Sequence, residues 1–284
     1  MRATSTTVGP LTLEELVKLP DDQLDVARGA ILIAKDIDPE VDLDKTLAAI
    51  DSLASELPDL TNREPFDQAV VVTEHFRKLG FLGNTKDYYD ARNSLLPEVI
   101  QRRTGIPITL SILWCAIAQR VGVNAHGVAF PGHFLVRVDK LTNPSEMQLV
   151  DPFANGRLLD EEAAKDLLRR ALGQGADLHL ELFAAATPRA ILVRLLSNLK
   201  SIFASRGEHA RAFLAVDRIV ALGPDSARNL RERAAVGMKL GAFDLARHDL
   251  ARVLELEPEA PDAKQIQAQV ADLDAPHARK QVFN

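Results

Sequence analysis

The chain has 284 residues, of which 46% are hydrophobic and 26% are charged, and its net charge is −6. This composition is that of an ordinary globular protein with room for two modest domains, and the acidic balance disfavours a protein built to neutralise nucleic-acid phosphates. The single cysteine, Cys115, excludes an internal disulfide and an all-thiolate zinc site.

The first stretch of the chain, up to about residue 104, has the pattern of several amphipathic helices. Its opening residues lack the apolar core of a signal peptide, and the longest apolar run, 108–118, is too short to cross a bilayer. We therefore expect a cytoplasmic protein without a membrane span. Apolar residues at helical spacing predict helices within 22–37, 42–58, 65–80 and 95–105.

A polar loop, 84–94, carries both tyrosines of the chain. Tyr88 and Tyr89 stand beside acidic and amide residues, and amphipathic aromatic side chains of this kind often form contact surfaces. Together with Asn93 and Arg103, they are candidate binding residues. A structural interpretation stays open beside this one, because Asn93 and Arg103 could instead tie the loop to the core by hydrogen bonds.

The middle stretch changes its hydrophobic period. Residues 108–121 are apolar on nearly every face, which predicts a helix at the centre of a domain, ended by Gly122. Short strands are predicted over 126–130, 133–138 and 147–151, joined by turn residues into an antiparallel meander. A buried helix on a small antiparallel sheet, with further helices outside, indicates the α+β class.

The stretch from residue 188 onward is helical and repeats internally with a spacing of 34 residues. This is the period of a tetratricopeptide helix pair, in which glycine permits the tight turn and proline separates the repeats. We predict a first domain over 1–187 and an all-α, tetratricopeptide-like module over 188–284 with two repeats and a capping helix. The recurring pairs are Gly207 and Gly241, Ala212 and Ala246, Arg218 and Arg252, and Pro224 and Pro258.

His133 and Asp151 form the candidate catalytic pair. His133 begins one predicted strand and Asp151 ends the next, and neighbouring antiparallel strands can bring such residues within hydrogen-bond reach. An imidazole oriented by a carboxylate is the base half of a nucleophilic triad. The alternative is that both are ordinary turn residues, one after Pro131-Gly132 and the other before Pro152.

The middle motifs also resemble a known family. Residues 88–111, 127–138 and 149–159 read YYDARNSLLPEVIQRRTGIPITLS, GVAFPGHFLVRV and LVDPFANGRLL. These motifs resemble the bacterial SirB-type proteins, in which an N-terminal transglutaminase-like region precedes C-terminal tetratricopeptide repeats. The transglutaminase-like core is a papain-type arrangement: a cysteine heads a buried helix, and a histidine and an aspartate lie on the following strands.

The resemblance implies the fold and two of the three residues of a triad. The histidine and aspartate of the family fall on His133 and Asp151, and the glycine that closes the helix falls on Gly122. The position of the cysteine falls on Pro107, which has no nucleophilic side chain and suits the first turn of a helix. The resemblance therefore implies the fold of the family but not its enzymatic activity.

Two other side chains of the buried helix remain candidate nucleophiles. Ser111 would complete a serine triad with His133 and Asp151, or its hydroxyl is simply bonded back to the preceding turn. Cys115 lies further along the helix, between Trp114 and an alanine, and is more simply read as a small core residue than as a thiolate.

Two functions follow from these residues. The first, which we favour, is a non-catalytic transglutaminase-like protein that acts as a protein-binding adaptor or regulator through its stacked helix pairs. The second is a papain-like hydrolase or acyl-transferase that uses His133 and Asp151 with Ser111, or less readily Cys115. Positive charge for an acidic partner is expected on the repeats at Arg206, Arg211, Arg228, Arg231 and Arg233, beside Glu208.

No residue pattern indicates a cofactor, a metal ion or a nucleic acid. The seven histidines are scattered without the spacing of a metal site, and there is no glycine-rich phosphate loop. We expect a protein or peptide partner, no cofactor, no metal ion, and no membrane or nucleic-acid partner. The sequence leaves the identity of the partner and the oligomeric state open.

Overall fold

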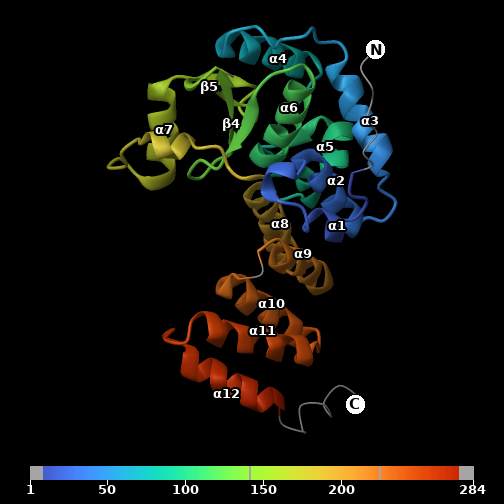
Figure 1. Cartoon of the computed structure of the whole chain (residues 1–284), viewed down its shortest axis with the longest axis vertical. Coiled ribbons are helices and arrows are strands. Elements are labelled where there is room, and N and C mark those ends of the chain that lie inside the picture. Colours follow the sequence, from blue (N-terminus) through green and yellow to red (C-terminus); the bar gives the residue numbers. More distant parts are fainter. Residues whose placement is uncertain (1–8, 141, 224, 275–284) are drawn as a thin grey trace. The chain divides into compact units, whose positions relative to one another are not determined.

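The computed structural model describes residues 9–140, 142–223 and 225–274 (Figure 1). The first eight residues, which bear on the expected absence of a signal peptide, and the repeat proline Pro224 lie outside this part. The chain divides into two compact units, Met1–Leu195 and Leu196–Asn284, and the division falls within helix α8, Pro188–Ser205. No helix of the described residues is long and apolar enough to cross a membrane.

The described residues up to Arg102 form five α-helices, and local sequence signals explain where several of them begin. The carboxylates of Asp25 and Asp42 accept hydrogen bonds from the backbone N–H groups of Arg28 and Lys45, which caps the second and third helices. Proline at the first helical position starts the fourth. The helices are α1 (Leu13–Leu16), α2 (Val26–Ile37), α3 (Leu43–Ala54), α4 (Pro65–Lys78) and α5 (Leu96–Arg102).

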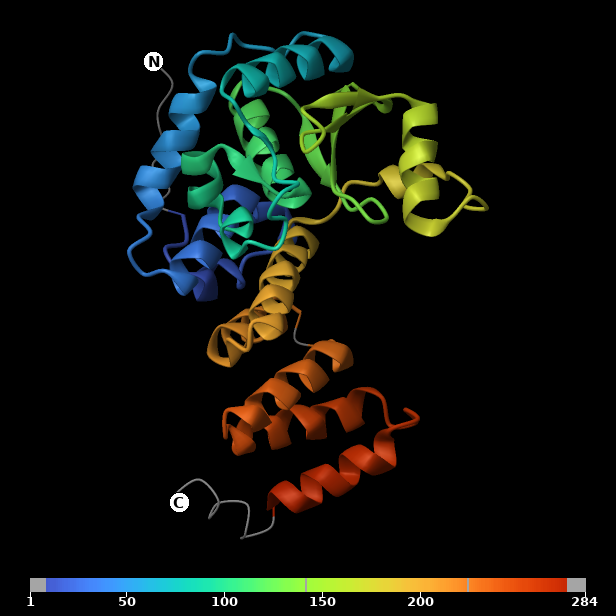
Figure 2. The same cartoon turned by 180° about the vertical axis from the view of Figure 1, so that it is seen from behind.

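Helix α6, Pro107–Arg120, is the core of the first unit, as its continuous apolar sequence predicts. Leu113, Trp114 and Ile117 have no exposed surface. The helix packs against α3 and α4 on one side and against strands of the sheet on the other, and Figure 2 shows it enclosed between them. Its C-terminal end is fixed by the side-chain amide of Gln119, which donates a 2.8 Å hydrogen bond to the carbonyl oxygen of Ala125.

The antiparallel meander is confirmed, with one more strand than the sequence predicted. Its strands pair in the order β3-β4-β5-β6, each antiparallel to the next. The additional strand, β6, is only three residues long, which explains why its alternation was not visible in the sequence. The bounds are β3 (Ala125–Val128), β4 (Leu135–Lys140), β5 (Asn143–Asp151) and β6 (Arg157–Leu159).

His133 lies in the turn before β4 and not at the first position of the strand. Its backbone N–H donates to the carbonyl oxygen of Phe130, and Gly132 takes the left-handed conformation, with φ +65°. The strand ladder starts only at Leu135, opposite Val128. The turn therefore releases the His133 backbone from the sheet.

Two smaller features complete the first unit. Helix α7, Glu161–Leu172, covers the meander, and an apolar cluster between them includes Val128, Leu149 and Leu168. A short parallel pair joins β1, Leu82–Gly83, to β2, Thr104–Gly105. This pair holds the loop that contains both tyrosines close to the sequence that enters α6.

The second unit contains paired helices, which confirms the tetratricopeptide-like reading of the C-terminal stretch. Gly207 and Gly241 both adopt positive φ, +72° and +76°, at the turns between paired helices, as the 34-residue repeat predicted. The helices that follow α8 are α9 (His209–Leu222), α10 (Ala227–Lys239), α11 (Phe243–Leu256) and α12 (Ala263–Asp274).

Arginines expected to offer free positive charge on the repeats are engaged in ion pairs within this unit. Arg233 of α10 pairs with Asp217 of α9 and with Asp249 of α11, which has no exposed surface. Arg231 pairs with both Glu257 and Asp262. Arg211 pairs with Glu208 and Arg228 pairs with Glu232, and the side chains of these two arginines are more exposed.

Candidate functional site

The structure brings His133 and Asp151 together. Nε2 of His133 lies 2.8 Å from Oδ2 of Asp151, which accepts the hydrogen bond, and the two side chains are 15% and 4% exposed. The other carboxylate oxygen, Oδ1, accepts the backbone N–H groups of Phe153 and Ala154, each at 3.1 Å. Asp151 is therefore held from two directions and fixes the imidazole, while no hydrogen bond of the described residues occupies Nδ1.

Aromatic rings surround this pair. Phe153 makes edge contacts with His133 and with Tyr88, at ring-centroid distances of 6.0 and 6.1 Å, and Tyr88 contacts Tyr89 at 5.4 Å. Phe153 can take this position because Gly83 has no side chain: a Cβ there would lie 2.6 Å from the phenyl ring. The contacts join two sets of residues that the sequence suggested separately, the candidate catalytic pair and the tyrosine loop.

Arg194 of α8 is a further member of this cluster. Its Nη2 donates a 2.7 Å hydrogen bond to the carbonyl oxygen of His133, and its guanidinium lies over the ring of Phe134, 5.3 Å from the centroid. Burial lowers the pKa of Arg194, an effect that Tyr88 opposes. Sequence reasoning did not single out this arginine, because only the tertiary fold brings α8 against the His133 turn.

Asn93 closes the tyrosine loop on itself, and Arg103 contacts a ring just outside the loop. Asn93 has no exposed surface; its Nδ2 donates to the carbonyl oxygens of Asp87 and Tyr88 at 2.7 and 3.3 Å. Arg103 adopts a left-handed backbone, with φ +57°, and its guanidinium lies 4.6 Å from the centroid of Phe81. Asn93 therefore fixes the shape of the loop from within, whereas Tyr88 and Tyr89 are 41% and 74% exposed.

Pro107 occupies the first turn of α6 and is buried. Polar contacts at this end come from Thr109, whose hydroxyl donates a 2.7 Å hydrogen bond to the carbonyl oxygen of Asn93 and accepts the N–H of Ile106. The start of α6 is thus connected to the tyrosine loop. Its first residue contributes a pyrrolidine ring and no nucleophilic atom.

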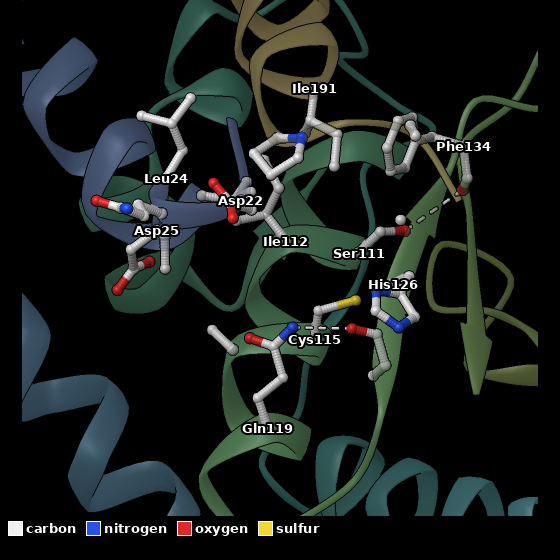
Figure 3. Close-up of a pocket in the computed structure, with 18 residues that line it drawn as sticks. Asp22, Leu24, Asp25, Ser111, Ile112, Cys115, Gln119, His126, Phe134 and Ile191 are labelled. Atoms are coloured by element: carbon white, nitrogen blue, oxygen red, sulfur yellow. Dashed lines mark hydrogen bonds between the residues drawn. The ribbon is translucent and has the colours of Figure 1, made fainter. Parts of the chain in front are cut away.

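The other two candidate nucleophiles line a cavity of about 370 Å³ (Figure 3). Ser111, Cys115 and Gln119 lie at intervals of four residues on one face of α6, and the cavity also includes His126 of β3. The Ser111 hydroxyl donates to the carbonyl oxygen of Phe134 at 3.3 Å. Among the described residues, no hydrogen bond joins Ser111 or Cys115 to His133.

His126, which sequence reasoning missed, is the histidine of this cavity. Its Nε2 lies 2.9 Å from the side-chain oxygen of Asn124 and 3.9 Å from a carboxylate oxygen of Asp139, and its side chain is 40% exposed. The four-residue spacing of Ser111, Cys115 and Gln119 was the signal in the sequence that marked this face of the helix. A strand over 126–130 was predicted, but the sequence did not show that this strand faces the helix at these residues.

The chemistry available at the cavity is limited by the state of the thiol. Burial raises the pKa of Cys115 above its usual range, so the thiol stays protonated at neutral pH and is a poor nucleophile. In the part of the chain that the structure describes, no group of three or more histidine, cysteine, aspartate or glutamate side chains is arranged to hold a metal ion.

Sequence comparisons agree with this architecture. The description "Transglutaminase-like superfamily" matches residues 44–197, more than half of the chain, and "Tetratricopeptide repeat" matches residues 199–271. The chain belongs to the transglutaminase-like superfamily. The expected order, a transglutaminase-like domain followed by tetratricopeptide repeats, is confirmed.

Curated relatives are similar in sequence to this transglutaminase-like chain over most of its length. The UPF0162 protein of Xylella fastidiosa (strain 9a5c) is 37% identical over 265 residues, which cover 91% of this chain and 93% of that protein. The UPF0162 protein of Vibrio cholerae is 25% identical and covers 88% of this chain and 92% of its own length. F-box only protein 21 of Homo sapiens is 27% identical over 81% of this chain, a match that covers 41% of the human protein.

Proposed function

We propose that this chain is a non-catalytic transglutaminase-like protein that acts as a protein-binding adaptor or regulator through its repeats. The observation that carries the proposal lies at the start of α6. Pro107 stands in the first turn of α6, where the family resemblance places the attacking cysteine, and it is buried. His133 and Asp151 then form an oriented base to which no hydroxyl or thiol of the described residues is hydrogen-bonded.

The repeat unit supports the binding half of the proposal. Stacked helix pairs expose extended surfaces on which a peptide or a helix of another protein can lie. Arg231 and Arg233 are half or more enclosed in their ion pairs, whereas Arg211 and Arg228 also pair with acidic residues but have side chains that are 56% and 86% exposed. These two arginines are the expected contacts for an acidic partner.

Affinity capture with the full chain tests this proposal. We expect the charge-reversed variant R211E/R228E to retain at least about tenfold less of the captured partner, because each lost charge contact at an interface weakens binding. His133→Ala should retain the partner. Arg63→Glu, a charge reversal at an exposed arginine of the first unit, is the matched control. Loss of the partner in His133→Ala but not in R211E/R228E would refute the adaptor function.

A second candidate function is a papain-like hydrolase or acyl-transferase, and the 2.8 Å contact between His133 and Asp151 favours it. Ser111 or Cys115 would then supply the nucleophile. Covalent labelling by a fluorophosphonate or by an epoxide inhibitor of cysteine hydrolases, abolished by Ser111→Ala or Cys115→Ala and by His133→Ala, would establish this activity. We expect no label that depends on His133.

A further inference from the structure

We propose that Arg194, together with Tyr88 and Tyr89, binds a carboxylate side chain in an acidic peptide segment of a protein partner. This inference rests on the proposal that the chain binds proteins, and it places a second contact surface on the transglutaminase-like domain, apart from the repeats. The juxtaposition that carries it is a partly buried guanidinium, without an ion pair among the described residues, that is joined through His133 and Phe153 to Tyr88 and its neighbour Tyr89.

The charge of Arg194 has no acidic partner among the described residues. Its contacts are the carbonyl oxygen of His133 at 2.7 Å, the face of the Phe134 ring and the electrostatic interaction with Tyr88. A partly buried cation without a counter-ion is unfavourable, and burial is the cause that lowers its pKa. A carboxylate that approaches the remaining N–H groups would form charge-assisted hydrogen bonds and relieve this penalty.

The guanidinium is held in position before any ligand arrives. Arg194 is fixed by the His133 carbonyl, and the His133 ring is fixed by Asp151. Phe153 contacts both His133 and Tyr88, which links the residue that anchors the arginine to the tyrosine loop. Pre-positioning of this kind lowers the entropy lost on binding, which favours recognition of even a short segment.

The tyrosines provide the rest of the surface. Tyr88 and Tyr89 are 41% and 74% exposed and meet edge to face. Burial raises the pKa of Tyr88, with a further contribution from Tyr89, so its hydroxyl stays protonated and can donate a hydrogen bond to an anion. Rigid aromatic residues beside an arginine are the composition of the energetically dominant part of many protein interfaces.

Local charge favours a single carboxylate over a polyanion. The tyrosine loop carries the exposed Asp87, its Asp90 is buried and paired with Arg92 and Arg102, and the whole chain has a net charge of −6. A nucleic-acid backbone binds through many cations, whereas Arg194 is accompanied here by few others, such as the exposed Lys86 of the loop, and by the exposed Asp87. One acidic side chain flanked by apolar residues satisfies the arginine and covers the tyrosine rings.

Binding of defined peptides to the isotope-labelled full chain tests the inference. The probes are the amidated peptide acetyl-Ala-Phe-Glu-Phe-Ala and the same peptide with Gln in place of Glu, followed through the side-chain Nε–H resonance of Arg194. We expect a saturable shift with the Glu peptide at a Kd of the order of 1 mM or tighter, and binding at least about tenfold weaker for the Gln peptide.

Variants assign the effect to this surface. Binding to the variants is followed through the backbone amide resonance of Tyr88, because Arg194→Gln lacks the Nε–H group. Arg194→Gln and Tyr89→Ala should each weaken binding of the Glu peptide at least about fivefold, and Arg63→Gln should leave it unchanged. Because Tyr89 is the more exposed tyrosine, its substitution keeps the test valid even if Arg194→Gln perturbs folding. Equal binding of the two peptides, or a Tyr89→Ala variant that binds normally, would overturn the inference.

A last comparison separates this inference from the proposed function. If a phosphoserine peptide or a single-stranded oligonucleotide shifts Arg194 while the Glu peptide does not, the assignment of a carboxylate ligand is wrong. If the Glu peptide fails and R211E/R228E still loses the captured partner, the Arg194 surface is refuted while the adaptor function of the repeats stands.

Discussion

The His133 pair and the α6 cavity divide between them the parts that a nucleophilic triad requires. His133 has a nearly buried carboxylate at 2.8 Å but no hydroxyl or thiol bonded to it among the described residues. The cavity has Ser111 and Cys115, but its histidine, His126, is paired with the amide of Asn124 and is more exposed. The comparison teaches that the right residue types are present in one domain without being assembled into one site.

The partner of each histidine differs in what it does for the fold. Asp151 accepts hydrogen bonds from an imidazole and from two backbone N–H groups in a buried environment, where electrostatic interactions are strong. Asn124 accepts a single bond from a ring that is 40% exposed to water. Asp151 therefore both orients the His133 ring and stabilises the fold. Asn124 does little to orient the His126 ring or to stabilise the fold.

The largest expected effect that tests this comparison concerns the thiol of the cavity. Cys115 in the folded chain should react with N-ethylmaleimide at least about a hundredfold more slowly than in the urea-unfolded chain, because burial keeps the thiol protonated and the fold must open locally. The rate is measured by mass spectrometry under both conditions. Reaction at the unfolded rate in the native protein would make the cavity the better candidate for an active site.

Removal of the carboxylate beside His133 should have the next largest effect. Asp151→Ala should lower the free energy of unfolding by about 2–4 kcal/mol, because it leaves three buried or partly buried donors without an acceptor. Urea unfolding of Asp151→Ala, His133→Ala and the double variant measures this loss and the coupling of the pair. A change below about 0.5 kcal/mol would show that the pair does not stabilise the fold.

The smallest effect is expected at the partner of the other histidine. Asn124→Ala should change the free energy of unfolding by no more than about 0.5 kcal/mol, because the bond to His126 is shared with solvent and the backbone carbonyl of residue 124 keeps its bond to Asp139. The same urea titration provides the measurement. A loss comparable with that of Asp151→Ala would remove the distinction between the two histidines.

Periodic features of the fold were predictable from the sequence. The all-apolar face pattern of 108–121 predicted the central helix, and the recurrence of Gly207 as Gly241 predicted the helix pairs. The contact between His133 and Asp151 was also predictable, because the two predicted strands that carry these residues were expected to pair, although His133 in fact lies in the turn just before its strand. These signals are local or depend on one pairing rule.

Contacts that depend on tertiary packing were not predictable. Arg194 is separated from His133 by sixty-one residues, and only the position of α8 brings its guanidinium to the His133 carbonyl. His126 likewise lines the same cavity as Ser111 and Cys115 only because β3 packs against α6. The expected free charge of Arg231 and Arg233 could not be judged either, because their acidic partners lie on other helices.

The ion pair of Arg233 with Asp249 has a consequence for protein engineering. Asp249 of α11 has no exposed surface, and its carboxylate accepts two hydrogen bonds, of 2.7 and 2.8 Å, from Arg233 of α10. A chimera that replaces α10 but keeps α11 would bury a lone negative charge, which is strongly destabilising. Helices α10 and α11 can therefore be exchanged only together, so that Arg233 and Asp249 stay paired. A substitution that removes one of these charges must also remove the other.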